Sequence, residues 1–366
     1  MTPGADRKTI EQMAPWTGEE EKRAVAEYLD GGGWLTEFRK TAELEERIAS
    51  YVGVNHAVML SSGTAALFCA VTACGIGPGD EVIVPDFTMI ATANAVLLAG
   101  AKPVFVDVSP EHLCLDLDAA ERAITERTRA ILLVSLNGRS PDMRRAVDLC
   151  RNHGLQLIED AAQALGSFHQ GKHLGTFGIC GILSFSPLKI ITTGQGGAVI
   201  TDDPDVAARV RQMKDFGRSR SGVDYHESIG YNFKFTDLQA VIGIEQMKKL
   251  AWRLRWKKEM FRLYRDELEG LPGVRFLDTD LSHVTPWFID VLVDDREKIA
   301  GRLLEHGIKA RPFYPPIHSQ PAYGVSGHYP VTEDAAARGL WLPSSTFLTD
   351  DDVKRVCEEI RSHASV

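Results

Sequence analysis

The chain contains 366 residues, of which 44% are hydrophobic and 25% charged, proportions typical of globular proteins rather than of collagen-like or disordered ones. Its 41 Lys and Arg residues against 50 Asp and Glu residues give a formal net charge of −9. This balance argues against a general nucleic-acid binder, which needs a net basic face. No stretch approaches the ~18 apolar residues of a membrane span, and residues 1–8 lack the apolar run of a secretory signal. The 6 cysteines form no CxxC pair, so we expect buried free thiols in a cytoplasmic protein.

Between residues 56 and 215, short apolar runs alternate with helical patterns. The expected strands are His56–Leu60, Glu81–Pro85, Pro103–Asp107, Ala130–Ser135, Gln156–Asp160, Gly181–Phe185 and Ala198–Thr201. The expected helices are Ala65–Cys74, Ile90–Ala99, Asp118–Ile124, Pro141–Asn152 and Pro204–Asp215. This alternation predicts an α/β fold with a mainly parallel sheet that helices cover on both faces. The last two strands are too close for a helical crossover, so at least one antiparallel pair is expected.

The pattern changes after a long helical stretch, Asp237–Leu268, and predicts a smaller α+β domain. Its other expected elements are the strands Val274–Phe276 and Trp287–Val293 and the helices Arg296–His306 and Asp350–Ser362, with a loop rich in proline and aromatic residues at Arg311–Tyr323. We place the boundary in the long helix. The larger domain, with the N-terminal segment, is then 1–245 and the smaller one 246–366.

Ligands of parallel α/β sheets bind at the carboxyl ends of strands, and three groups of polar residues follow strands here. The first, Ser61–Ala65, opens a helix whose free N–H groups can bind an anion; an ordinary Ser/Thr helix cap is the alternative. The second, Ile158–Gln163, contains Asp160, whose buried carboxylate needs a positive partner, such as the protonated pyridine nitrogen of pyridoxal 5′-phosphate. Gln163 could hydrogen-bond the ring hydroxyl of that cofactor, the alternative being an N-cap Asp with a surface Gln.

The third group centres on Lys189, which follows a strand and precedes the Gly-rich turn Thr192–Gly197. A lysine among apolar residues loses its charge more easily, as Schiff-base chemistry requires. The alternative is a surface lysine with a buried stem. The 11 histidines show no metal-binding spacing, so no metal is expected.

In this order, the three groups resemble the DegT/StrS family of nucleotide-sugar aminotransferases, which are fold-type I pyridoxal-phosphate enzymes. The similarity extends over nearly the whole chain. The matching segments are Trp34–Thr36, Gly77–Pro85, Thr88, Ala91–Thr92, Glu159–Ala164, Lys189–Gly197, Gly230–Thr236 and Arg311–Pro315.

The resemblance implies a role for each matching position. Lys189 would be the catalytic residue, first as the Schiff-base lysine and then as general acid and base. Asp160 would pair with the pyridinium nitrogen and Gln163 with the ring hydroxyl. The other implied cofactor contacts are Gly63, Thr64 and Ser184 at the phosphate, Met89 at the ring, and Asn232 at the phosphate of the neighbouring subunit. The last position implies a homodimer with shared active sites.

Departures from the family pattern concern mainly the substrate. Met89 stands where relatives usually place an aromatic ring, so weaker cofactor affinity is expected. Arg139 is a candidate for a substrate phosphate or carboxylate, with a surface salt bridge as the alternative, and Lys234 replaces a common Arg. The remaining positions expected to bind substrate are Trp34, Asn137, Arg311, Tyr314 and His318, with a structural role as the alternative for His318.

The resemblance implies an aminotransferase that moves an amino group from L-glutamate to a nucleotide-linked sugar ketone. The residues after Lys189 and the stretch Arg311–Pro315 are most similar to the family's GDP-perosamine synthases, so a 4-keto-6-deoxy sugar is the expected substrate. Three alternatives stay open. They are an aminotransferase acting on a 3-keto sugar or a cyclitol ketone, a pyridoxal-phosphate sugar dehydratase, which would carry His in place of the lysine, and a non-catalytic regulator on the same fold.

Overall fold

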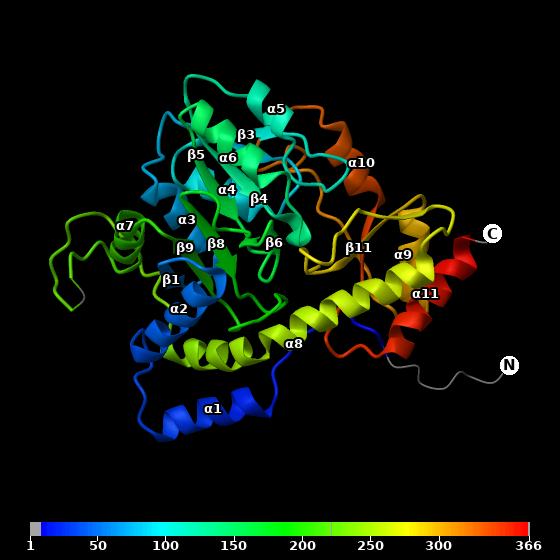
Figure 1. The fold of residues 1–366 in the computed structure, drawn as a ribbon, viewed down its shortest axis with the longest axis horizontal. Coiled ribbons are helices and arrows are strands. Elements are labelled where there is room, and N and C mark those ends of the chain that lie inside the picture. The colour runs from blue at the N-terminus through cyan, green and yellow to red at the C-terminus, as the bar shows by residue number, and fades with distance from the viewer. Residues whose placement is uncertain (1–8, 221, 365–366) are drawn as a thin grey trace.

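A seven-stranded sheet forms the centre of the molecule (Figure 1). The structure, a computed structural model, describes residues 9–220 and 222–364. In the sheet order β1-β9-β8-β5-β4-β2-β3, the strands are β1 (His56–Leu60), β9 (Gly197–Thr201), β8 (Cys180–Ser184), β5 (Gln156–Asp160), β4 (Thr128–Val134), β2 (Glu81–Pro85) and β3 (Lys102–Val106). Strand β9 is antiparallel to both neighbours, whereas the pairs from β8 to β3 are parallel. The expected α/β fold with a mainly parallel sheet and an antiparallel exception is therefore confirmed.

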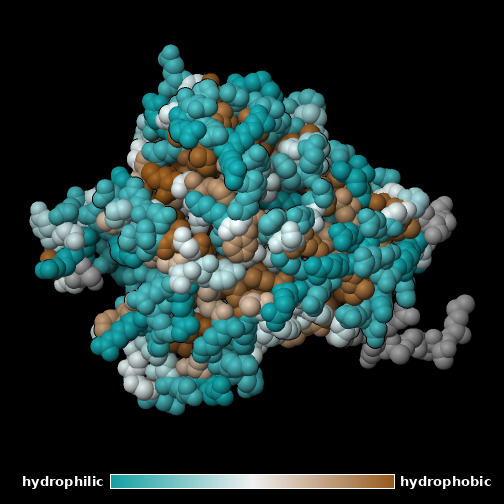
Figure 2. Space-filling view, viewed as in Figure 1, coloured by the Kyte–Doolittle hydropathy of each residue, from teal (hydrophilic) through white to brown (hydrophobic). Residues whose placement is uncertain are grey.

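Helices cover both faces of this sheet. Successive side chains of a strand point to opposite sides, so each buried strand contributes apolar side chains to both faces. In β1, Ala57 and Met59 belong to one apolar cluster, while Val58 and Leu60 belong to the other. The covering helices are α3 (Gly63–Ala73), α4 (Ala91–Leu98), α5 (Leu117–Arg122), α6 (Met143–Asn152) and α7 (Pro204–Lys214). Figure 2 shows a mainly hydrophilic surface with hydrophobic patches through the middle of the face in view.

The long helix α8 (Asp237–Leu268) runs unbroken from the large sheet to the C-terminal part (Figure 1). Two helices that the sequence analysis did not identify, α1 (Glu19–Asp30) and α2 (Arg39–Val52), pack against it. The buried carboxylate of Asp237 accepts hydrogen bonds from the amides of Phe38 and Thr41 at 2.8 and 2.9 Å. The first residue of α8 therefore also orders the first turn of α2.

A four-stranded antiparallel sheet forms the C-terminal part. Its elements are β10 (Val274–Phe276), β11 (Ile289–Val293), β13 (Gly339–Leu342) and β12 (Arg311–Pro312), in that order, with the helices α9 (Arg296–Glu305), α10 (Pro330–Arg338) and α11 (Asp350–Ala364). The elements α10, β12 and β13 were not predicted from the sequence. Ile10 pairs with Ile308 and belongs to the apolar cluster of this part, although we assigned the N-terminal segment to the larger domain. The boundary at 245/246 lies inside the continuous α8, and the division into two domains stays a prediction.

Three short elements complete the fold: β6 (Phe168–His169), β7 (Lys172–His173) and the 3-10 turn η1 (Leu136–Gly138) between β4 and α6. Within the described ranges, no helix combines the length and the hydrophobicity needed to cross a membrane. Residues 1–8, in which we expected no secretory signal, lie outside these ranges.

Candidate active site

A cavity of about 570 Å³ opens at the carboxyl ends of β5 and β8. Its wall combines the N-terminus of α3, the segment that follows β8, and residues from the C-terminal part. The sequence-predicted residues that line it are Gly63, Thr64, Met89, Asp160, Gln163, Ser184, Lys189, Arg311 and Tyr314. Segments far apart in the sequence thus meet at one edge of the sheet.

One end of the cavity can bind an anion. Ser62 caps α3, its hydroxyl accepting a hydrogen bond from the Ala65 amide at 3.1 Å. The first amides of a helix have no partner within the helix and carry its positive dipole end, so those of Gly63 and Thr64 can donate to a ligand. A Cβ atom on Gly63 would lie 3.0 Å from the Ser184 hydroxyl oxygen. Glycine therefore keeps open a cradle that a phosphate group fits.

Asp160 ends β5 and is 5% exposed. The Thr92 hydroxyl donates to it at 2.8 Å and the Ala162 amide at 3.1 Å. Burial raises the pKa of Asp160, while these two hydrogen bonds and the charge of Lys189 lower it. A buried carboxylate facing a cavity fits a cationic ligand group such as a pyridinium nitrogen. Thr92, which holds this carboxylate, has no role that the sequence pattern indicates.

Gln163 lies beyond Asp160 and is buried. Its side-chain carbonyl oxygen accepts a hydrogen bond from the Asn137 amide at 2.8 Å. With the oxygen so engaged, the amide nitrogen is the group left to donate to a ligand in the cavity.

Lys189 lines the same cavity as Asp160. Burial lowers the pKa of Lys189 to about 8, although the charge of Asp160 raises it; the charge of Arg311 lowers it further. The ammonium nitrogen lies 3.7 Å from the ring centroid of Trp287. Near neutral pH both forms of the amine are therefore accessible, as a group that accepts and returns protons requires.

Arg311 and Tyr314 line the cavity from the C-terminal part. The Arg311 guanidinium is exposed and lies 5.7 Å from the Tyr314 ring centroid. Burial raises the pKa of Tyr314 to about 12, so this phenol stays protonated. The pair can offer a cation and a hydroxyl donor to an anionic substrate.

Two residues expected to bind substrate lie behind the cavity instead. Arg139 is 2% exposed and forms two hydrogen bonds with the Asp290 carboxylate of β11, at 2.6 and 3.1 Å. The Asn137 side chain donates to the Phe288 carbonyl and accepts from the Phe288 amide, both at 2.7 Å. These groups are engaged in joining the two sheets, so we withdraw both from the substrate site.

Four further predicted residues also lie outside the cavity of this chain. Lys234 donates to the Asp215 carboxylate at 2.7 Å. His318 is hydrogen-bonded to the buried Asp86 carboxylate at 2.5 Å and holds the C-terminal loop against the end of β2. Trp34 and Asn232 are exposed, and the Trp34 ring nitrogen donates to Thr36 at 2.5 Å. Within one chain, none of the four reaches the cavity wall.

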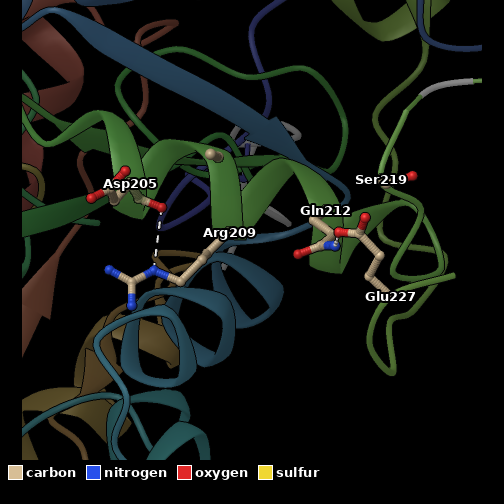
Figure 3. Close-up of a pocket in the computed structure, with 6 residues that line it drawn as sticks. Asp205, Arg209, Gln212, Ser219 and Glu227 are labelled. Carbon is tan, nitrogen blue, oxygen red and sulfur yellow. Dashed lines mark hydrogen bonds between the residues drawn. The ribbon is translucent and has the colours of Figure 1, made fainter.

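A second hollow, of about 500 Å³, lies beside α7 (Figure 3). Gln212 of α7 donates to the carboxylate of Glu227 at 3.2 Å, and Arg209 donates to the backbone carbonyl of Asp205 at 3.2 Å. Its lining contains none of the sequence-predicted site residues, and these polar groups bind one another. We assign it no role.

The chain is similar to known proteins along nearly its whole length. The model of the DegT/DnrJ/EryC1/StrS aminotransferase family matches residues 15–361. The chain is 35% identical over 362 residues to the GDP-perosamine synthase of Escherichia coli O157:H7, covering 98% of this chain and 99% of that protein. It is 36% identical over 366 residues to the dTDP-4-dehydro-2,3,6-trideoxy-D-glucose 4-aminotransferase of Saccharopolyspora spinosa, covering 95% and 94%. The structure of DesV from S. venezuelae, in complex with a ketimine intermediate, covers 95% of each chain at 34% identity and a TM-score of 0.90.

The residues of the cavity fit pyridoxal 5′-phosphate. The glycine cradle at the start of α3 suits its phosphate, the buried carboxylate of Asp160 suits its ring nitrogen, and the amine of Lys189 suits its aldehyde. The chain belongs to the DegT/DnrJ/EryC1/StrS aminotransferase family and is a sugar aminotransferase that uses pyridoxal 5′-phosphate.

Proposed function

We propose that the enzyme transfers the amino group of L-glutamate to C4 of a nucleotide-linked 4-keto-6-deoxy sugar, as a GDP-perosamine synthase does. The observation that carries this proposal is the convergence of Lys189, Asp160 and Arg311 on one cavity. The relatives named GDP-perosamine synthase and 4-aminotransferase support a sugar acceptor that reacts at C4.

The cofactor would be held at both ends. Gly63, Thr64 and Ser184 would bind its phosphate, because helix amides and a hydroxyl are donors that suit an anion. Asp160 would hold the ring nitrogen, and Gln163 would donate to the ring hydroxyl. When bound, pyridoxal 5′-phosphate supplies an electron sink for the bonds at the amino carbon.

Lys189 would move the proton between the amino carbon and the cofactor. Its pKa of about 8 allows it to accept a proton in one half of the reaction and to return it in the other. Asp160 keeps a negative charge near the amine.

Arg311 would bind the anionic groups of both substrates in turn. A guanidinium group forms paired hydrogen bonds with carboxylates and phosphates. The exposed side chain on β12 can therefore bind a carboxylate of glutamate in the first half-reaction and a phosphate of the nucleotide sugar in the second. Tyr314 would add a hydroxyl donor beside it.

We also propose a cytoplasmic homodimer with shared active sites. Asn232 and Trp34 are exposed outside the cavity of their own chain, where they are available to a second copy. Apolar side chains in the loop after α7 are also exposed: Phe216, Tyr225, Ile229 and Tyr231. Such a group supports a protein interface. The six buried free cysteines support a reducing compartment.

The test uses purified protein loaded with pyridoxal 5′-phosphate, L-glutamate, and a panel of GDP-, UDP- and dTDP-linked keto sugars. We expect 2-oxoglutarate to form in equal amount with an aminated sugar, fastest with the GDP-linked 4-keto-6-deoxy sugar. Arg311→Leu should raise KM for both substrates about 10- to 100-fold, because it removes a charge-assisted hydrogen bond.

The matched control is Arg209→Leu, on α7 and outside the cavity, which should leave KM unchanged. Amination of a 3-keto sugar or a cyclitol ketone instead would refute the C4 assignment. A product that has lost water and gained no nitrogen would show a dehydratase. Binding of a nucleotide sugar without any turnover of glutamate would show a regulator.

A further inference from the structure

We infer that Trp287 is a positioning residue for Lys189, and that the face of its indole ring holds the free ammonium group of that lysine. The ammonium nitrogen lies 3.7 Å from the ring centroid, well within the distance at which a cation is attracted to an aromatic face. The inference rests on the proposed role of Lys189 and adds a residue to which neither the sequence nor the family resemblance gave a role.

A hydrogen bond to the segment that carries Lys189 holds the Trp287 side chain in place. Its Nε1–H group donates to the carbonyl of Leu188, the residue before Lys189, at 2.7 Å. Its ring stacks on Phe288 with the centroids 3.8 Å apart, and the residue is 5% exposed. The side chain therefore has one orientation, which ties the backbone before Lys189 and the ring that meets its amine into one unit.

Contacts on the C-terminal side of Trp287 anchor its segment to the turn that follows β4 of the large sheet. The residue after it, Phe288, exchanges two hydrogen bonds with Asn137, and Asp290 pairs with Arg139. These contacts explain why two residues expected at the substrate lie buried behind the cavity. Their position indicates that they hold the C-terminal part where its tryptophan reaches the catalytic lysine.

The charged groups around Lys189 have opposing effects on its ammonium group, so an aromatic contact can still influence its protonation. Asp160 on β5 attracts the ammonium group, Arg311 on β12 repels it, and burial disfavours the charged form. Tyr314 stands nearby as a neutral phenol. An aromatic face stabilises the ammonium group without adding a second carboxylate, so the amine keeps both protonation states within reach of neutral pH.

The test measures the protonation of Lys189 directly in cofactor-free protein. Brief acetylation with acetic anhydride from about pH 6 to pH 10, followed by mass spectrometry of the Lys189 peptide, gives the pKa of its amine. Protein in which the tryptophans carry fluorine on the benzene ring keeps the shape of Trp287 but weakens the negative face of the ring. We expect the pKa of Lys189 to fall by about half to one pH unit.

The exposed Lys102, paired with Glu81, is the internal control, and the extent of its acetylation should be the same in both proteins. Trp287→Phe is the second variant, because it retains a weaker aromatic face without the N–H donor, and a smaller fall is expected. An unchanged pKa of Lys189 in the fluorinated protein would overturn the inference. So would a rise in Trp287→Phe, since it would mean that the ring only shields the amine from water. No substrate is present, so a wrong substrate assignment cannot affect either result.

Discussion

Two regions of the molecule contain similar residue types with different partners. One is the rim of the cavity at the ends of β5 and β8, and the other is the junction between the two sheets around Arg139 and Asn137. At the rim, Asp160 and Lys189 line the open cavity, and the charge of Asp160 acts on the Lys189 amine. At the junction, Arg139 and Asn137 meet partners from the segment around β11. A charged or amide side chain can thus bind a ligand or move a proton only where the fold places no complementary protein group beside it.

This difference has an energetic basis. Arg139 is as fully buried as the apolar core residues, and its charge is compensated by two hydrogen bonds to Asp290. Asp160 is also buried, but its protein partners, Thr92 and the Ala162 amide, are neutral. Only a cationic ligand group or Lys189 can compensate its charge, and that need is typical of a binding site.

The largest expected effect is at the rim. Lys189→Ala should reduce transamination about 10,000-fold or more, because it removes both the Schiff-base amine and the general acid and base. The measurement is the rate of 2-oxoglutarate formation under single-turnover conditions. The phosphate cradle is intact in this variant, so the cofactor should still bind non-covalently; dialysis followed by phosphate analysis tests that. Activity within tenfold of wild type would mean that another group moves the proton.

The second effect belongs to the junction. Arg139→Leu leaves the Asp290 carboxylate buried without its partner, and we expect the free energy of unfolding to fall by about 3–5 kcal/mol. KM for both substrates should stay near wild type, in contrast to Arg311→Leu. Denaturant unfolding and steady-state kinetics on the same preparations give the two numbers.

The double variant Arg139→Leu/Asp290→Leu is the control, because replacing a whole buried ion pair with apolar residues of similar volume is often close to neutral. It should recover much of the lost stability. A raised KM in Arg139→Leu with unchanged stability would restore the residue to the substrate site and remove the distinction between the two regions.

The sequence located the rim well because its signals are local. Continuous apolar runs define β2 and β5 with the observed bounds, and the side chain that follows such a run lies at the sheet edge by geometry alone. Helix α1 was missed because a single residue of it, Glu21, is buried, so it lacks an apolar stripe. Strand β13 is four residues long and becomes a strand only through pairing with β11 and β12.

The junction could not be located in the same way. Nothing near Arg139 in the sequence indicates that Asp290, 151 residues away, will face it. Trp287 was expected to begin a strand, but β11 begins at Ile289, so the indole ring lies outside the strand and meets Lys189. A tryptophan that packs in a core and one that faces a catalytic amine have the same local pattern, so only the tertiary structure separates them.

The smallest expected effect is at Met89 on the rim, where the family resemblance implies an aromatic ring. Met89 is 45% exposed and lines the cavity with a thioether, which packs on an aromatic ring more weakly than a second ring does. Met89→Tyr should therefore tighten cofactor binding about two- to tenfold. The dissociation constant of pyridoxal 5′-phosphate, titrated into cofactor-free protein, is the measurement. Met89→Leu, which removes the sulfur and adds no ring, should bind the cofactor no more tightly than wild type. Equal affinity for the Tyr and Leu variants would show that this side chain forms the rim without stacking on the cofactor.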